Sequence, residues 1–221
     1  MRLLLIRHGQ TPANVRGELE TARPGPPLTK LGEEQAAAIP TALAHETIDA
    51  IYVSPLSRTH LTAAPLARAL NLEPMVIEGI EEIEAGELEG RADKEAVWAY
   101  LETVFGWLSG DLDRAMPGGP DGARFFERFD GALRSIAERH PEDATVAVVS
   151  HGGAIRVWTG ARGKNLGEDF TSRTILDNTG VVVLIGSPDD GWIVETWGGE
   201  PVGGEALHDD RAKDPTGEQT R

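Results

Sequence analysis

Residues 3–11 read LLLIRHGQT, and this stretch decides how the chain folds. The four apolar residues at its start are typical of a strand that is buried on both faces of a sheet. Arg7 and His8 follow directly, so a cation and a potential nucleophile stand where that strand ends. Gly9 comes next, and a glycine lets the backbone approach a ligand closely. The stretch therefore predicts a buried strand that delivers a reactive pair of side chains to one edge of a sheet.

Two other predicted strands end in the same way. A strand over residues 145–149 leads into the sequence SHGG, which contains His151 in a second His-Gly turn. A strand over residues 48–53 leads into a Ser-Pro turn that delivers Arg58. The carboxyl ends of parallel strands form the ligand-binding edge of an open α/β sheet. We expect the two histidines, Arg7 and Arg58 to meet there as a compact cationic site suited to a phosphate.

Helical patterns alternate with the strands along the chain. This order predicts an α/β fold, a three-layer α/β/α sandwich around a mostly parallel, mixed sheet. The last two strands are expected to add antiparallel character. Helices are expected at 29–44 with Thr29 as cap, at 56–70, after Asp93, from Asp121, and from 152 to 158, with strands at 3–6, 48–53, 75–77 (a short edge strand), 145–149, 181–185 and 192–197.

The chain is predicted to form one domain over residues 1–197. Its length of 221 residues suits a single domain that buries a sizeable core. Within that domain, residues 87–123 read as a helical insertion that acts as a lid. Residues 198–221 are rich in glycine, hold six acidic and three basic residues, and are expected to form an acidic, flexible tail.

Composition excludes several classes of protein. The formal net charge of −15 argues against general affinity for nucleic acid and against docking on an anionic membrane. The absence of cysteine excludes a disulfide scaffold, a thiolate nucleophile and a cysteine-based metal site. No apolar stretch approaches the roughly 20 residues that a membrane span needs. We expect a cytoplasmic protein.

The ordered motifs resemble the histidine phosphatase superfamily, the phosphoglycerate mutase-like proteins. The sequence RHGQT at 7–11 is similar to the family signature, and SPLSR at 54–58 and SHGG at 150–153 are similar to two later motifs. The acidic segment 80–90 matches the family pattern that places a glutamate at position 82. A lone RHG is a weak signal, whereas the ordered set is a strong one. The similarity runs from residue 2 to about residue 185.

The resemblance implies a mechanism for the predicted site. His8 attacks phosphorus in line and becomes a phosphohistidine. Arg7, Arg58 and His151 hold the phosphoryl oxygens, and Glu82 protonates the leaving oxygen and later deprotonates the attacking water. The two arginines disfavour protonation of His8, which must be neutral to attack. The cations come from side chains, so neither a metal nor another cofactor is expected.

Four further residues are expected to contact the substrate, and one assignment stays open. The expected contacts are Gly9, Thr11, Asn14 and Gly152. Glu82 lies in a run of glutamates, which is more often a solvated face than a site, and Glu84 is the alternative acid.

Three functions remain in competition at this point. The first is a metal-independent phosphatase of small phosphomonoesters. The second is a mutase of the phosphoglycerate type, which must also hold a substrate carboxylate. The insertion has three basic residues against eight acidic ones, which favours the phosphatase. The third is a catalytically silent module that binds a phospho-ligand, which is disfavoured because His8, Arg58 and His151 are all present. The expected partner is a small phosphorylated metabolite, and a homodimer is an open alternative to a monomer.

Overall fold

A single six-stranded sheet, in the order β3-β2-β4-β1-β5-β6, forms the centre of the molecule. These elements come from a computed structural model that describes residues 1–167 and 169–217. The first four strands in that order run parallel, whereas β5 is antiparallel to both β1 and β6. The sheet is therefore mixed and mostly parallel, as the sequence predicts. The strands are β1 (Arg2–Arg7), β2 (Ala50–Val53), β3 (Met75–Val76), β4 (Thr145–Ser150), β5 (Val181–Ser187) and β6 (Gly191–Gly198).

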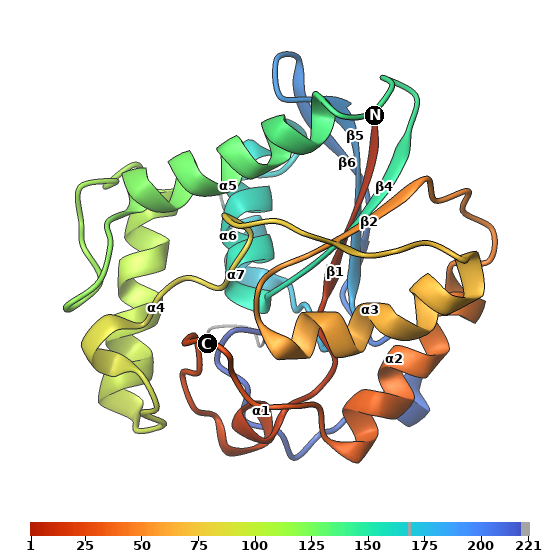
Figure 1. The fold of residues 1–221 in the computed structure, drawn as a ribbon. Coiled ribbons are helices and arrows are strands. Elements are labelled where there is room, and N and C mark those ends of the chain that lie inside the picture. The colour runs from red at the N-terminus through yellow and green to blue at the C-terminus, as the bar shows by residue number, and fades with distance from the viewer. Residues whose placement is uncertain (168, 218–221) are drawn as a thin grey trace.

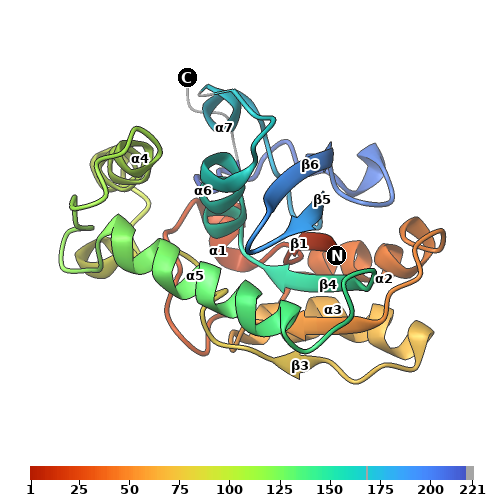
Figure 2. The same cartoon turned by 90° about the horizontal axis from the view of Figure 1, so that it is seen from above.

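Helices cover both faces of this sheet and make a three-layer sandwich (Figure 1). Helices α2 and α3 cover one face, while α5 and α6 cover the other, with α4 outermost on that side (Figure 2). The helices are α1 (Pro12–Arg16), α2 (Lys30–Ala42), α3 (Ser57–Leu70), α4 (Lys94–Leu108), α5 (Gly122–Ala137), α6 (Gly152–Arg162) and α7 (Phe170–Arg173), with single 3-10 turns η1 (Gly86–Leu88) and η2 (Glu205–Leu207). Among the helices of the described residues, none has the length and apolar character to cross a bilayer.

The apolar run in β1 explains why the sheet is buried on both faces. Leu3 and Leu5 belong to the core under α5 and α6, whereas Leu4 and Ile6 belong to the core under α2 and α3. All four side chains are fully buried. Side chains alternate between the faces of a strand, so one continuous apolar run supplies both cores.

Side-chain caps fix where three of the long helices begin. The side chains of Thr29, Asp93 and Asp121 accept hydrogen bonds from the backbone N–H groups of Gly32, Ala96 and Arg124. These bonds satisfy donors that the first turn of a helix leaves unpaired. The predicted starts of α2, α4 and α5 are confirmed.

The insertion contains α4 and leads into α5. Tyr100, Val104 and Trp107 of α4 are buried in the core shared with α6, so the insertion is packed against the domain. The lid role assigned to it stays a prediction.

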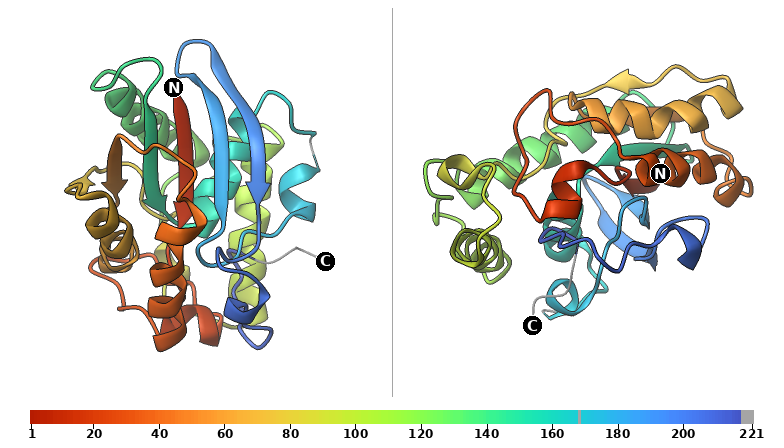
Figure 3. Two further views of the ribbon diagram at one scale, coloured as in Figure 1. Left: turned by 90° about the vertical axis from the view of Figure 1, so that its right-hand side faces the viewer. Right: turned by 90° about the horizontal axis from the view of Figure 1, so that it is seen from below.

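The C-terminal segment folds back along the domain. Residues 199–217 pass beneath the carboxyl ends of the strands, beside α1 (Figure 3). Pro201 and Asp214 are buried, and the backbone N–H of Asp177 donates to the Gly199 carbonyl. The expected flexible tail is thus in contact with the domain as far as residue 217. Its last four residues, 218–221, lie outside the described residues.

Candidate active site

The carboxyl ends of β1, β2 and β4 bring the two predicted His-Gly turns together. Arg7 pairs with Ser150 in the register of β1 and β4, and the His8 N–H donates to the Ser150 carbonyl at 3.0 Å. The next residues along each strand are His8 and His151, whose ring centroids lie 5.2 Å apart. Both side chains are buried. The structure places the two histidines where the sequence predicts them.

His8 is held as a neutral imidazole by its contact with the backbone. Its Nδ1 lies 2.8 Å from the Gly9 carbonyl oxygen, which can only accept, so Nδ1 carries the proton. The lone pair therefore lies on Nε2. Burial lowers the pKa of His8 well below its usual range, and the charges of Arg58 and Arg7 lower it further. A neutral imidazole with a free Nε2 can act as a nucleophile at pH 7.

Two buried guanidinium groups flank this imidazole. Arg58 donates from Nε to His151 Nδ1 at 3.2 Å and from Nη2 to the Glu20 carbonyl at 3.1 Å. Burial lowers the pKa of Arg58 to about 10, so the group remains cationic at pH 7. Within the described residues, Arg7 Nε and Arg58 Nη1 are buried without a hydrogen-bond partner. Unpaired charged donors are costly in an interior unless an anion satisfies them.

Glu82 is anchored to the start of α6, next to His151. Its carboxylate accepts from the N–H groups of Gly153 at 3.0 Å and Ala154 at 2.7 Å, and also from Ile83. Glu82 is buried, whereas Glu84 is exposed. Of the two glutamates that the sequence leaves open, Glu82 is thus the one that contacts the His151 turn.

Arg128, which the sequence analysis did not single out, fixes the segment that carries Glu82. Its Nη1 donates to the carbonyls of Gly79 and Glu81, and its Nη2 donates to the carbonyl of Glu82 at 2.7 Å. Arg128 lies on α5 beside Phe125, where the sequence reads as the polar side of a core helix.

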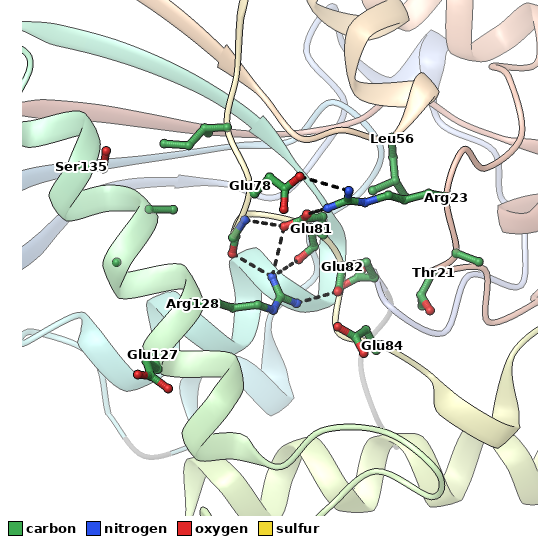
Figure 4. A pocket seen from close by; sticks show the side chains of 15 residues that line it. Thr21, Arg23, Leu56, Glu78, Glu81, Glu82, Glu84, Glu127, Arg128 and Ser135 are labelled. Atoms are coloured by element: carbon green, nitrogen blue, oxygen red, sulfur yellow. Dashed lines mark hydrogen bonds and ion pairs between the residues drawn. The ribbon is translucent and has the colours of Figure 1, made fainter.

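An acidic cavity lies between α5 and the segments that carry Thr21 and Glu82 (Figure 4). Its volume is about 800 Å³, and its lining includes five glutamates and two arginines. Both arginines are paired with carboxylates, because Arg23 binds Glu78 and Glu81, and Arg128 binds Glu81. The side chains of this cavity therefore present excess negative charge on the side of the Glu82 segment that faces α5.

The predicted substrate contacts have different environments. Thr11 caps α1 in a reciprocal box with Asn14, whose Oδ1 accepts from the Thr11 backbone at 2.9 Å. The Asn14 amide nitrogen is therefore the group that can donate to a ligand. The Gly9 N–H donates to Thr62 Oγ1 at 2.9 Å, so this N–H is already engaged.

Gly152 has a steric role at the start of α6. A Cβ at this position would lie 2.8 Å from Arg7 Nε and 3.0 Å from Thr216 Oγ1. The position requires glycine because the Arg7 guanidinium passes directly over it.

Sequence reasoning missed two further residues that hold the site. Asn178 is buried and donates from Nδ2 to the His8 carbonyl at 3.0 Å. Asp214, from the C-terminal segment, pairs with Arg7 Nη2. Neither residue stands in a recognisable motif, and Asp214 is separated from Arg7 by 207 positions. Only the folded chain brings them to the site.

A buried neutral histidine lies beside guanidinium donors that have no hydrogen-bond partner among the described residues, an arrangement suited to a phosphoryl group. The family model of the histidine phosphatase superfamily (branch 1) matches residues 3–199. The chain belongs to this superfamily.

Two curated relatives show how far this similarity extends. Phosphoserine phosphatase 1 of Hydrogenobacter thermophilus is 34% identical over 151 residues, which cover 68% of this chain and 71% of that protein. The PE-PGRS family protein PE_PGRS11 of Mycobacterium tuberculosis is 36% identical over 219 residues, or 91% of this chain. The match spans only 37% of the length of PE_PGRS11.

Solved structures show the same fold. A mycobacterial glucosyl-3-phosphoglycerate phosphatase has a TM-score of 0.75 at 25% identity, covering 90% of this chain and 99% of that one. A phosphoserine phosphatase from Entamoeba histolytica, in complex with 3-phosphoglyceric acid, has a TM-score of 0.72 at 25% identity, with 90% and 97% covered.

Proposed function

We propose that the chain hydrolyses small phosphomonoesters without a metal, through a phosphohistidine formed on His8. The observation that carries this proposal is a pair of buried donors, Arg7 Nε and Arg58 Nη1, which have no partner among the residues the structure describes and lie beside a neutral histidine whose lone pair is on Nε2. A phosphoryl group supplies the anionic oxygens that such donors need. The phosphatases among the family relatives support the same class of reaction.

The reaction consists of two displacements at phosphorus. His8 Nε2 donates its lone pair to phosphorus as the bond to the ester oxygen breaks, and the alcohol leaves with a proton. Water then attacks phosphorus, the P–N bond breaks, and inorganic phosphate leaves as the histidine recovers its lone pair. Arg7 and Arg58 stabilise the negative charge on the phosphoryl oxygens in both steps.

Glu82 is proposed to carry the proton in both steps. It is buried next to the His151 turn, and the hydrogen bonds to Gly153 and Ala154 fix its position. Protonated Glu82 gives its proton to the leaving oxygen, and the resulting carboxylate accepts a proton from the attacking water.

The same site is expected to favour hydrolysis over isomerisation. A mutase must hold a second acidic group of its substrate, and the insertion has three basic residues against eight acidic ones. Of these bases, Arg91 is paired with Asp93 and Arg114 with Glu102. The proposed substrate is a small phosphomonoester, and the proposed compartment is the cytoplasm.

Phosphate release from a panel of phosphorylated metabolites in excess EDTA tests the proposal. The wild-type protein is expected to turn over at least one of them, and His8→Ala is expected to abolish turnover. His60→Ala, which replaces an exposed histidine on α3, is the matched control and is expected to keep full activity. A metal requirement, or normal turnover by His8→Ala, contradicts the mechanism. With 3-phosphoglycerate, isomerisation that outpaces phosphate release identifies a mutase instead.

A further inference from the structure

The hydroxyl groups of Ser54 and Thr59 form a buried chain behind His151. Ser54 Oγ lies 2.8 Å from His151 Nε2 and 3.2 Å from Thr59 Oγ1, and all three residues have no exposed surface. Thr59 Oγ1 also lies 2.9 Å from the Ser54 carbonyl and 2.8 Å from the Leu56 carbonyl. Carbonyl oxygens only accept, so the Thr59 hydroxyl uses its one proton on them.

The direction of every hydrogen bond in this chain follows from that constraint. Thr59 Oγ1 can only accept from Ser54, so the Ser54 proton points to Thr59. Ser54 Oγ must then accept from His151, which places a proton on Nε2. Arg58 Nε is purely a donor and bonds Nδ1, so Nδ1 must be the unprotonated nitrogen. Two independent constraints give the same tautomer for His151.

We propose that Ser54 and Thr59 are positioning residues, which commit His151 Nε2–H to Ser54 and leave Nδ1 to accept from Arg58 Nε, so that this chain of hydrogen bonds orients the Arg58 guanidinium at the phosphoryl site. This inference rests on the proposed phosphoryl transfer only for its kinetic consequence, because the tautomer itself is a property of the free protein.

Nitrogen-15 NMR of histidine-labelled protein tests the tautomer directly, with His151→Gln to assign the signal. The wild-type protein is expected to show the Nε2–H tautomer for His151. Ser54→Ala is expected to lower kcat about tenfold, which matches the loss of one hydrogen bond to a buried group, while Arg58 Nε still keeps Nδ1 unprotonated. Ser54→Thr, which keeps the hydroxyl, is expected to restore most of kcat. Ser57→Ala removes a hydroxyl from the same turn outside this chain and is expected to behave as wild type.

Two outcomes overturn the positioning role. One is an Nδ1–H tautomer in the wild-type protein. The other is a Ser54→Ala protein whose kcat equals that of the wild type. If the tautomer follows the expectation but no variant turns over any phosphomonoester, the hydrolase proposal fails and the tautomer assignment stands.

A second, independent observation concerns the C-terminal segment, which lies over the Arg7 side chain. Arg7 Nη2 pairs with the buried Asp214 carboxylate and also donates to Thr216 Oγ1 at 3.2 Å. Arg156 Nη1 donates to the Thr216 carbonyl at 2.8 Å, and the Leu176 N–H donates to the Gly217 carbonyl at 3.0 Å. The segment thus delivers a carboxylate to one of the two guanidinium groups of the site.

Contacts upstream hold the same segment against the signature motif. Gln10 donates from Nε2 to Asp209 at 2.8 Å, and Gln35 donates from Nε2 to the Leu207 carbonyl at 2.8 Å. His208 lies 2.7 Å from the Asp177 carboxylate. These contacts bring the segment to the edge of the sheet where His8 and His151 meet.

We infer that residues 208–217 act as a built-in competitor for anions, in which the Asp214 carboxylate takes the place of a phosphoryl oxygen on Arg7. Arg7 Nη1 donates to the Leu176 carbonyl at 2.6 Å, so a phosphoryl ligand must displace Asp214 before Nη2 can join Nε in holding it. The apparent affinity for phosphate is then reduced by the fraction of molecules in which the segment is closed. This inference rests on the proposed phosphoryl site.

Titration of the full chain with inorganic phosphate, followed by calorimetry, tests the competition without any turnover. Asp214→Asn removes the competing charge and is expected to bind phosphate about tenfold more tightly, which corresponds to a wild-type open fraction of about one tenth. Asp214→Glu keeps the carboxylate and is expected to bind within about twofold of wild type. Glu205→Gln removes one charge from an exposed position of the same segment and controls for net charge.

Equal or weaker phosphate binding by Asp214→Asn overturns the competitor role and shows that Asp214 supports Arg7 instead. An equal gain for Glu205→Gln also overturns it, because the effect then comes from net charge. If neither the wild type nor Asp214→Asn binds phosphate, the phosphoryl site itself is wrong.

Discussion

Replacing Arg128 by methionine is expected to destabilise the fold and to displace the proposed proton donor. Methionine keeps an apolar stem against Phe125 but removes the donors to the carbonyls of Gly79, Glu81 and Glu82. A hydrogen bond contributes about 1 kcal/mol net, so three lost bonds cost about 3 kcal/mol of unfolding free energy. The released segment carries Glu82, and a misplacement of about 1 Å costs up to roughly a hundredfold in rate.

Urea unfolding and steady-state phosphate release measure the two effects separately. Tryptophan fluorescence can follow unfolding because the chain has five tryptophans. Arg124→Met is the matched control, since Arg124 is an exposed arginine on the same helix. Arg128→Lys keeps the charge but lacks the planar guanidinium group, so its stability and kcat are expected to lie between those of the wild type and Arg128→Met. An Arg128→Met protein within about 1 kcal/mol of wild type, with unchanged kcat, refutes this reasoning.

Three further predictions concern pH, the proton donor and a helix cap. Burial, and after it the charge of Arg58, lowers the pKa of both His8 and His151 in the folded chain. Unfolding therefore takes up two protons as the pH falls below about 6.5, and the free energy of unfolding should fall there by up to about 2.7 kcal/mol per pH unit. Urea unfolding of His8→Asn should show about half that slope. An unchanged slope in His8→Asn contradicts the assignment. Glu82→Gln should slow esters with poor leaving groups more than activated aryl phosphates, and equal losses point to another acid, with Glu84 the first to test. Asp121→Ala removes the cap of α5 and should cost about 1 kcal/mol by urea unfolding, whereas a cost near zero means that water replaces the cap.

The long elements were predictable because their signals are local. Thr29, Asp93 and Asp121 each stand at the predicted start of a helix, and in the structure the side chain of each caps that helix. The apolar run of β1 has no polar face, which makes it recognisable in the sequence and also explains why it is buried on both faces of the sheet. Local sequence patterns were therefore sufficient to predict the three layers of the fold and the ends of the strands.

Short elements were not predicted because they are too short to show a periodic apolar pattern. Helix α1 has five residues and α7 has four, so neither completes enough turns to show an apolar face. The sequence around α1 instead reads as the start of a loop rich in glycine and proline. Its Thr11–Asn14 capping box is visible only once the turn is built.

The core of the candidate site was predictable, whereas its supports were not. His8, Arg58 and His151 follow recognisable strand ends, so parallel strands that share an edge bring them together. Arg128 and Asp214 act through contacts with residues far along the chain, and each has the local sequence of an ordinary surface charge. The acidic, glycine-rich composition of the tail predicts a solvated segment, whereas in the structure Asp214 is buried in an ion pair with Arg7.

Capture of the phosphoenzyme tests the central claim most directly. Rapid acid-free quenching of the wild-type protein with a ³²P-labelled phosphomonoester, in excess EDTA, is predicted to trap an alkali-stable, acid-labile phosphoryl group. Peptide mapping is predicted to place that group on His8, and His8→Ala is predicted to trap none, while His60→Ala traps as much as wild type. A phosphoryl group on any other residue, or turnover with no trapped intermediate and a dependence on added metal, contradicts the account.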